Sequence, residues 1–175
     1  KIKKELEEIQ NKEIEKLTSQ KVRDEIIAGI QMLEYQINTL ITSNGRIPNV
    51  ALFLNLQEDD VYIKENAIII EEILKRRYKG IRGKNGEYIT PEFPKLIYVL
   101  NKSNSLNGGK YDYITKIAIE STRKRQAPYY ISAKKMKENR ENQVFAPMGL
   151  FNFAESLKDE NGNYKFSGRF NQEIG

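Results

Sequence analysis

The sequence contains no cysteine and no histidine among its 175 residues. The absence of cysteine excludes disulfide bonds and thiolate nucleophiles within the chain, and the absence of both residue types excludes zinc sites built from them. Histidine is also the most common general base, and its absence excludes a histidine in that role. Any chemistry must therefore use carboxylates, lysines, tyrosines, hydroxyls or backbone groups.

Long hydrophobic runs are lacking too. The longest apolar stretches, Val50–Leu54 and Ala67–Ile70, are far shorter than the roughly 20 residues that a membrane-spanning helix needs. The lysine-rich start shows no secretory signal pattern, and we therefore expect a cytoplasmic protein without a membrane partner. Because the chain begins at Lys1 and not at methionine, we expect a processed or excised piece of a longer protein.

Charge is plentiful and slightly positive. The net charge is +5, and 39% hydrophobic with 30% charged residues is typical of a folded domain. The basic residues between positions 123 and 140 fit either a phosphate-bearing ligand or, more commonly, a solvated helix face. We do not expect a nucleic-acid partner. The cluster consists of Arg123, Lys124, Arg125, Lys134, Lys135, Lys137 and Arg140.

Hydrophobic periodicity predicts an alternation of helices and strands, which favours an α/β fold with a largely parallel sheet or barrel. Apolar positions at helical spacing, such as Ala67 in the helix that ends at Gly80 and Ile114 in the helix at 111–125, are expected to face the core. Helices are predicted at 2–17, between a Ser19 cap and a stop at 43–45, from Asp59 or Asp60 to Gly80, at 111–125 and from Ser132 to about 140. Strands are predicted at 50–54, 95–100 and 129–131, with turns at 84–87 and 159–163.

Few local motifs indicate chemistry. No glycine-rich phosphate loop is present. The adjacent acids Glu71-Glu72 and Asp59-Asp60 are interpreted as helix caps and solvated faces, because neighbouring residues on a helix point apart. Tyr129-Tyr130 could stack on bases, but positions in the core and at its rim are favoured. Gly29, inside the second predicted helix, is expected to permit close packing against a neighbour.

The segment 143–153 combines apolar and aromatic residues with proline and glycine, which predicts a buried or cleft-lining loop. Together with other segments, in the same order, it resembles the large subunit of anaerobic (class III) ribonucleoside-triphosphate reductase, of the glycyl-radical enzyme family. The matching segments are Glu34–Thr39 with Ser43–Pro48, Thr90–Leu100, Tyr111–Arg125 with Pro128–Met136, Pro147–Gly149, and Asp159–Gly162 with Gly168–Gln172.

The resemblance implies a fold and an activity. The fold is part of a ten-stranded α/β barrel with outer helices and a central finger loop. We expect residues 1–18 to form a surface helix or linker, and residues 19–175 a partial barrel with its finger loop at 144–156. The implied activity is the reduction of ribonucleotides to deoxyribonucleotides, the precursors for DNA replication.

The resemblance also assigns site residues. In the family, a cysteine at the loop tip becomes a thiyl radical and removes the 3′ hydrogen of the ribose. Leu150 occupies that position here and has no S–H bond, so we expect the chain alone to be inactive. Asn171 matches an asparagine that contacts the substrate ribose, and Met148 and Gly149 match positions that shape the loop.

The family's cofactors and partners follow from the same resemblance. We expect no cofactor in this chain, because the glycyl-radical segment and the cysteines of the structural zinc site are absent from it. The family uses a glycyl radical made by an S-adenosylmethionine/iron–sulfur activase, ATP or dNTP effectors, and ribonucleoside triphosphates as substrates. Self-association, or a partner chain that completes the barrel, is also expected. An inactive fragment, a nucleotide-binding or partner-docking pseudoenzyme, and one product of a split gene remain open as alternatives.

Overall fold

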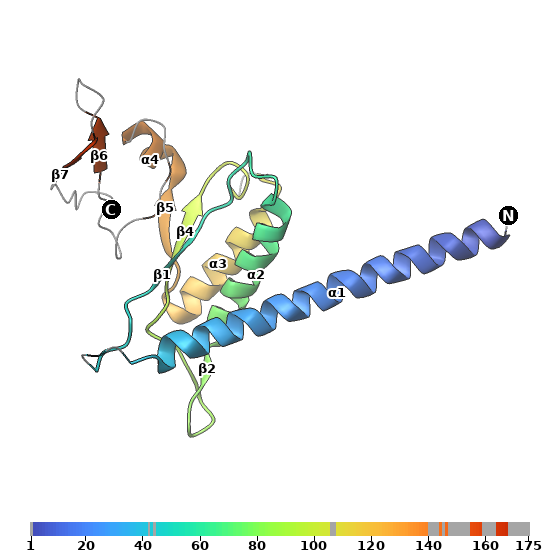
Figure 1. The fold of residues 1–175 in the computed structure, drawn as a ribbon, viewed down its shortest axis with the longest axis horizontal. Helices are drawn as coiled ribbons and strands as arrows, with labels where there is room; N and C mark the ends of the chain where they lie inside the picture. The colour runs from blue at the N-terminus through green and yellow to red at the C-terminus, as the bar shows by residue number, and fades with distance from the viewer. Residues whose placement is uncertain are drawn as a thin grey trace.

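The structure is a computed structural model that describes residues 2–41, 43, 45–105, 108–139, 144, 146, 155–158 and 164–167, with side chains described between 10 and 138 and at 144 and 146. Helices and strands alternate along most of the chain (Figure 1). The helices are α1 (Ile2–Thr39), α2 (Ile63–Lys79), α3 (Asp112–Arg125) and α4 (Ala133–Asn139). The strands are β1 (Ala51–Leu54), β2 (Ile81–Arg82), β3 (Tyr88–Ile89), β4 (Lys95–Leu100), β5 (Tyr129–Ser132), β6 (Glu155–Lys158) and β7 (Tyr164–Ser167).

The centre of the fold is a three-stranded parallel sheet in the order β1-β4-β5. Leu52 pairs with Leu96 and Val99 pairs with Ile131. The crossovers between these strands contain α2 and α3, as parallel strands require a long connection. The predicted α/β fold with a parallel sheet is confirmed, whereas the complete ten-stranded barrel remains a prediction.

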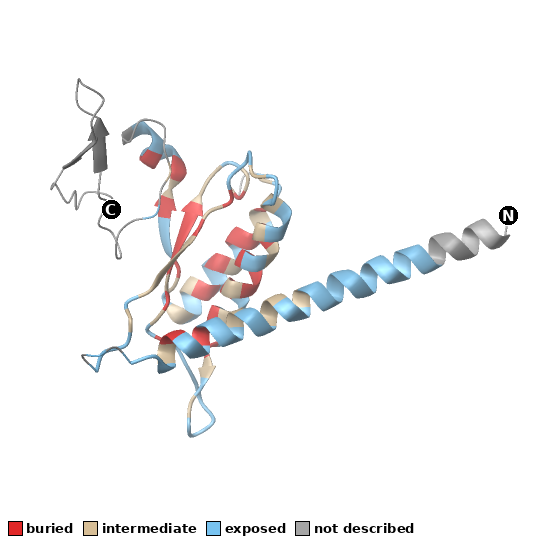
Figure 2. Ribbon diagram, in the orientation of Figure 1, coloured by how far each residue is buried: buried red, intermediate tan, exposed pale blue. Residues whose placement is uncertain are grey.

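The two faces of the sheet are covered differently. Alternating strand residues point to opposite faces, so Leu96 and Tyr98 pack against α2 and α3, while Ile97 lies on the other face with Met136 of α4. Figure 2 shows the buried residues concentrated on the strands and on the sheet-facing sides of α2 and α3. The predicted inward positions are confirmed: Ala67, Ile70, Leu74, Ile114 and Ala118 are buried, and Ile63 and Ile117 pack against them.

A single helix replaces the two helices predicted before residue 43. Helix α1 passes through Ser19 without a break, so the expected Ser19 cap is wrong. Serine stabilises a helix start only where the chain leaves helical geometry, and extending an existing helix costs far less than starting a new one. Figure 2 shows that residues 10–22 of α1 are exposed and that its C-terminal part contacts the body. The expected division at residue 18 stays a prediction.

Local signals at the other helix ends follow the prediction in part. The expected cap of α2 by Asp59 or Asp60 is wrong, because Tyr62 is the N-cap residue and no side chain caps it. The Oδ1 atom of Asp60 instead accepts a hydrogen bond from the amide of Tyr62 (2.8 Å), within the turn before α2. Gly80 ends α2 with a φ of 82°, a conformation that favours glycine. Ser132 Oγ accepts the amide of Lys135 at 3.4 Å at the start of α4. Among the described helices, none combines the length and the hydrophobicity needed to cross a membrane.

Two short hairpins complete the described chain. Strands β2 and β3 pair antiparallel on either side of the turn predicted at 84–87. Strands β6 and β7 also pair antiparallel. The turn predicted at 159–163 lies between them but outside the described residues. The hairpin expected there is therefore confirmed by its strands.

Candidate functional site

An open cleft lies at the carboxyl ends of the three parallel strands. It has a volume of about 840 Å³, within the range typical of small-molecule sites. In open α/β sheets, ligands bind at this edge because the loops that follow the strands converge there. The cleft is lined by Asn55, Leu56, Gln57, Glu58, Asp59, Leu100, Asn101, Lys102, Ser105, Ala133, Lys134, Lys137, Glu138 and Val144.

The loop after β4 is held rigidly beside the cleft by two asparagines. The Nδ2 atom of Asn101 donates to the Leu56 carbonyl (2.6 Å), which ties this loop to the one after β1. Asn104 is fully buried; its Nδ2 atom donates to the Val99 carbonyl (2.8 Å), and its Oδ1 atom accepts the amide of Asn101 (2.9 Å). The hydroxyl of Thr115 donates to the carbonyl of Asn104 at 2.6 Å. These bonds fix the backbone on both sides of Lys102.

Charged side chains of both signs reach the cleft. Lys102 comes from the loop after β4, and Lys134 and Lys137 come from α4. Carboxylates are contributed by Glu58 and Asp59 of the loop after β1, and by Glu138 of α4. The cleft can therefore bind a polar ligand that carries anionic groups at one end and hydroxyl or amine donors at another.

Four residues were expected from the sequence to form the site. Leu150, Met148, Gly149 and Asn171 lie outside the described residues. Val144, the first residue of the expected finger loop, is described. It lines the cleft and packs against the Ile97–Ile131–Met136 cluster, on the sheet face opposite α2 and α3.

The adjacent acids Glu71 and Glu72 are not solvated, so that prediction is wrong. They are only 8% and 7% exposed. The guanidinium of Arg23 on α1 binds both carboxylates, and Lys75 Nζ lies 2.5 Å from Glu71 Oε1. Burial alone raises the pKa of Glu71, but hydrogen bonds from Arg23 and Lys75 outweigh it and hold the pKa below its ordinary value. The cluster joins α1 to α2 and is structural.

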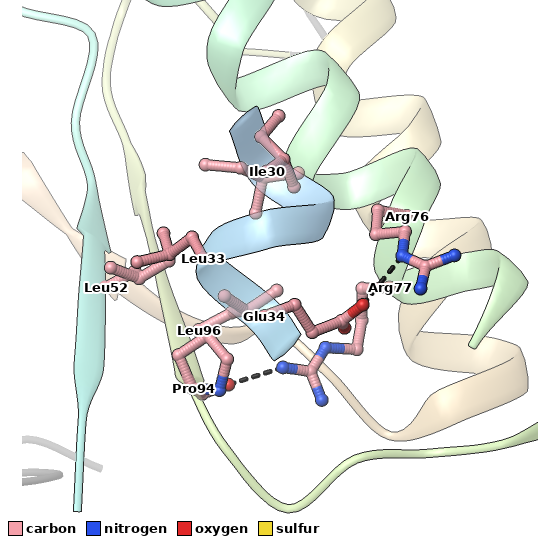
Figure 3. Close-up of a pocket in the computed structure, with 9 residues that line it drawn as sticks. Ile30, Leu33, Glu34, Leu52, Arg76, Arg77, Pro94 and Leu96 are labelled. Atoms are coloured by element: carbon pink, nitrogen blue, oxygen red, sulfur yellow. Dashed lines mark hydrogen bonds and ion pairs between the residues drawn. The ribbon is translucent and has the colours of Figure 1, made fainter. Parts of the chain in front are cut away.

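A second polar cluster fastens the end of α1 (Figure 3). Arg76 Nε donates to Glu34 Oε2 at 2.6 Å, and Arg77 donates to the carbonyls of Pro91 (2.6 Å) and Pro94. The cavity beside them measures about 20 Å³, which is room for one water molecule. Burial lowers the pKa of Arg77, which is 4% exposed. These contacts are packing and not a ligand site.

The tyrosine pair and the first part of the basic cluster are used within the fold. Tyr130 packs edge-on against Tyr98, with ring centroids 6.0 Å apart, and its hydroxyl lies 2.8 Å from the Thr122 hydroxyl. Tyr98 bonds Thr115 at 2.8 Å, and its burial raises its pKa to about 12. Arg125 donates to the carbonyls of Tyr78, Lys79 and Tyr88. The preferred interpretation of Tyr130, as a residue of the core and rim, is confirmed.

In the part of the chain that the structure describes, no group of three or more acidic side chains that could hold a metal ion is found. The chain has no cysteine. The residues present therefore do not fit the cysteine zinc site that the sequence resemblance implies for the family.

The cleft was not found from the sequence, although its loops could have been. Asn101, Lys102 and Asn104 directly follow the strand predicted at 95–100. Polar residues just after a buried parallel strand are the signal that indicates such an edge. The positions of α4 and Val144 across the cleft depend on tertiary packing, which no local pattern encodes.

Comparison with known proteins gives one consistent result. A family model described as anaerobic ribonucleoside-triphosphate reductase matches residues 5–174. A protein of that name from Enterobacteria phage T4 is 35% identical over 153 residues, covering 86% of this chain and 24% of the relative. The Haemophilus influenzae protein is 33% identical (86% and 20% covered), and the Escherichia coli protein is 32% identical (82% and 19% covered).

The chain thus spans less than a quarter of the length of these curated relatives. The family model nevertheless covers nearly all of the chain, and its parallel sheet agrees with the fold that the matching segments imply. The chain therefore belongs to the anaerobic ribonucleoside-triphosphate reductase family.

Proposed function

We propose that this chain forms part of the catalytic barrel of an anaerobic ribonucleoside-triphosphate reductase, which converts ribonucleotides to deoxyribonucleotides. The observation that carries the proposal is the family match to residues 5–174 of a chain whose parallel strands end in an 840 Å³ cleft. A nucleotide is a ligand of suitable size for such a cleft. In the assembled enzyme, the cleft would form part of the substrate site.

The expected finger loop at 144–156 supports this assignment. Its first residue, Val144, lines the cleft and packs on the sheet face that α2 and α3 leave free. In the proposed barrel this face is the interior, where a radical is shielded from water and from side reactions. A loop that starts here can bring its tip within reach of a single C–H bond of a bound ribose.

We further propose that the chain has no reductase activity by itself, because Leu150 stands where the family has its radical cysteine. Hydrogen abstraction by a thiyl radical breaks a C–H bond of the ribose and forms an S–H bond on the protein. A leucine side chain has no sulfur and cannot supply this step. Since the 175 residues contain no cysteine, no neighbouring side chain can replace it.

A reductase assay tests the proposal. We expect the purified chain, supplied with an activase, S-adenosylmethionine, ribonucleoside triphosphates and formate or a thiol, to form no deoxynucleotide. A hybrid in which residues 20–172 replace the matching part of the phage T4 relative should be equally inactive. The hybrid with Leu150→Cys should regain turnover, whereas a control hybrid with Leu157→Cys should not. Turnover by the purified chain, or by the hybrid without an added cysteine, would refute the assignment.

A nucleotide-binding module without turnover is the second candidate, favoured by the three lysines of the cleft. It predicts saturable binding of ATP or a dNTP by the isolated chain, measured by calorimetry. If no nucleotide binds and no partner chain is recovered by pull-down, this candidate fails.

A further inference from the structure

The lysines of the described chain fall into two groups: those whose ammonium group has a partner within the fold, and those that have none, among them two lysines of the cleft. Lys75 and Lys116 form ion pairs with carboxylates. The ammonium groups of Lys95, Lys110 and Lys124 lie 5.3, 5.5 and 4.2 Å from the centres of aromatic rings. These five cations are already occupied by contacts within the fold.

Lys102 and Lys137 have no comparable contact. Among the described residues, neither side chain forms an ion pair, a hydrogen bond or a ring contact. Lys134 has one weak partner, since its Nζ lies 3.9 Å from Glu138 Oε1 and both side chains are largely exposed. An exposed pair of this kind contributes little free energy, so the cation of Lys134 is also available to a ligand.

The three cations also have a defined arrangement. Lys134 and Lys137 are three residues apart on α4 and therefore lie on the same face of that helix. Lys102 belongs to a different wall of the cleft, in the loop fixed by Asn101 and Asn104. Because this backbone is already ordered, binding an anion costs only the ordering of the lysine side chains.

We propose that Lys102, Lys134 and Lys137 bind the triphosphate group of the nucleotide, an assignment that rests on the proposed function of the cleft. A polyphosphate chain, whose negative charge is spread over several groups, suits several cations from two walls of the cleft better than a ligand with a single carboxylate does. The carboxylates of Glu58 and Asp59, which come from the loop after β1, repel the phosphates. Glu58 and Asp59 therefore direct the triphosphate toward the lysines. Their own carboxylates remain available to accept hydrogen bonds from the hydroxyl groups of the nucleoside.

Calorimetry on the full chain tests the assignment with CTP, ATP and inorganic tripolyphosphate as probes. We expect tripolyphosphate to compete with the nucleotide. Lys102→Gln and Lys137→Gln should each weaken nucleotide binding about tenfold, as for the loss of a charge-assisted hydrogen bond. Lys102→Arg should restore most of the loss at that position. Lys84→Gln, which removes an exposed lysine in the β2–β3 turn, should leave the Kd unchanged.

The outcomes separate this assignment from the function on which it rests. If nucleotides bind but both glutamine variants keep the wild-type Kd, or if Lys84→Gln weakens binding equally, the lysine assignment is wrong and the nucleotide cleft survives. If neither nucleotide nor tripolyphosphate binds the wild-type chain, both the assignment and the binding role of the cleft are overturned. Unchanged thermal melting of each variant serves as the control for folding.

Discussion

Arg23 and Glu71 are 48 positions apart in the chain, yet their side chains form a polar link between α1 and α2. Lys75 and Glu72 complete the cluster, and the hydroxyl of Tyr113 lies close enough to be influenced by it. Burial of Glu71 is tolerated because two cations neutralise it. At this site, α1 is held by charge as well as by hydrophobic packing.

The pKa of Glu71 makes this link dependent on pH. The folded-state pKa lies below the ordinary value of 4.5, so the ionised carboxylate favours the folded state. This contribution is fully present above pH 4.5 and is lost as the pH falls through the lower folded-state value. We expect Glu71→Gln to reduce the free energy of unfolding by about 1–3 kcal/mol at pH 7 and by progressively less below pH 4.5.

Denaturant unfolding at several pH values measures this effect. Glu65→Gln, at an exposed position in the first turn of the same helix, is the matched control and should change stability by less than about 0.5 kcal/mol. A difference between wild type and Glu71→Gln that stays constant from pH 7 to pH 3 would show that the charge of Glu71 does not stabilise the fold.

Single residues also mark the limit of what the sequence predicts. Gly80 as a helix stop was predictable because that signal acts within a few residues. The burial of Glu71 and Glu72 was not predictable, because it depends on Arg23, whose position is set by the way α1 packs. The expected site residues Leu150 and Asn171 come from the family resemblance alone.

At the scale of elements, two glycines in helical segments have opposite environments. Gly29 is exposed in α1, and a Cβ atom added there would meet no atom within 4 Å. The close packing expected for Gly29 is therefore not found in the described chain. A Cβ atom added to Gly80 would lie 2.6 Å from the Ile89 carbonyl oxygen and 2.9 Å from Arg125 Nη2, at a backbone φ of 82°.

These environments predict opposite effects of the same substitution. Gly29→Ala should raise the free energy of unfolding by about 0.5–1 kcal/mol, because alanine loses less backbone entropy in a helix. Gly80→Ala should lower it by about 1–3 kcal/mol through backbone strain and the clash with the β2–β3 hairpin. Thermal melting of the two variants measures both. A destabilising Gly29→Ala would mean that another chain packs against this face of α1 in solution.

Elements with strong periodicity were predicted well. Strand β4 has the predicted bounds, and α3 begins one residue later than expected. The failures have physical reasons. The two-residue strands β2 and β3 are too short to show any period. The continuity of α1 through Ser19 reflects cooperativity over many residues, which outweighs a local capping preference.

At the scale of the whole molecule, the sheet has two edges. Strands β1 and β5 each pair with β4 alone within the described sheet. Unpaired backbone donors and acceptors at such edges favour association with another strand. We therefore expect the isolated chain to self-associate or to require a partner that completes the barrel. Sedimentation at increasing protein concentration measures this, and a monomer at every concentration would contradict it.

In the proposed catalytic barrel, we expect the loop around Leu150 to lie at the cleft, on the free face of the parallel sheet. The natural absence of cysteine allows a direct test, because Leu150→Cys creates a single site for a nitroxide spin label. We expect the label to broaden the amide NMR signals of Asn101, Lys102 and Ala133 at the cleft. The signals of Lys84 in the β2–β3 turn should remain sharp. Sharp signals throughout the cleft would contradict the placement of the loop and, with it, the proposed catalytic barrel.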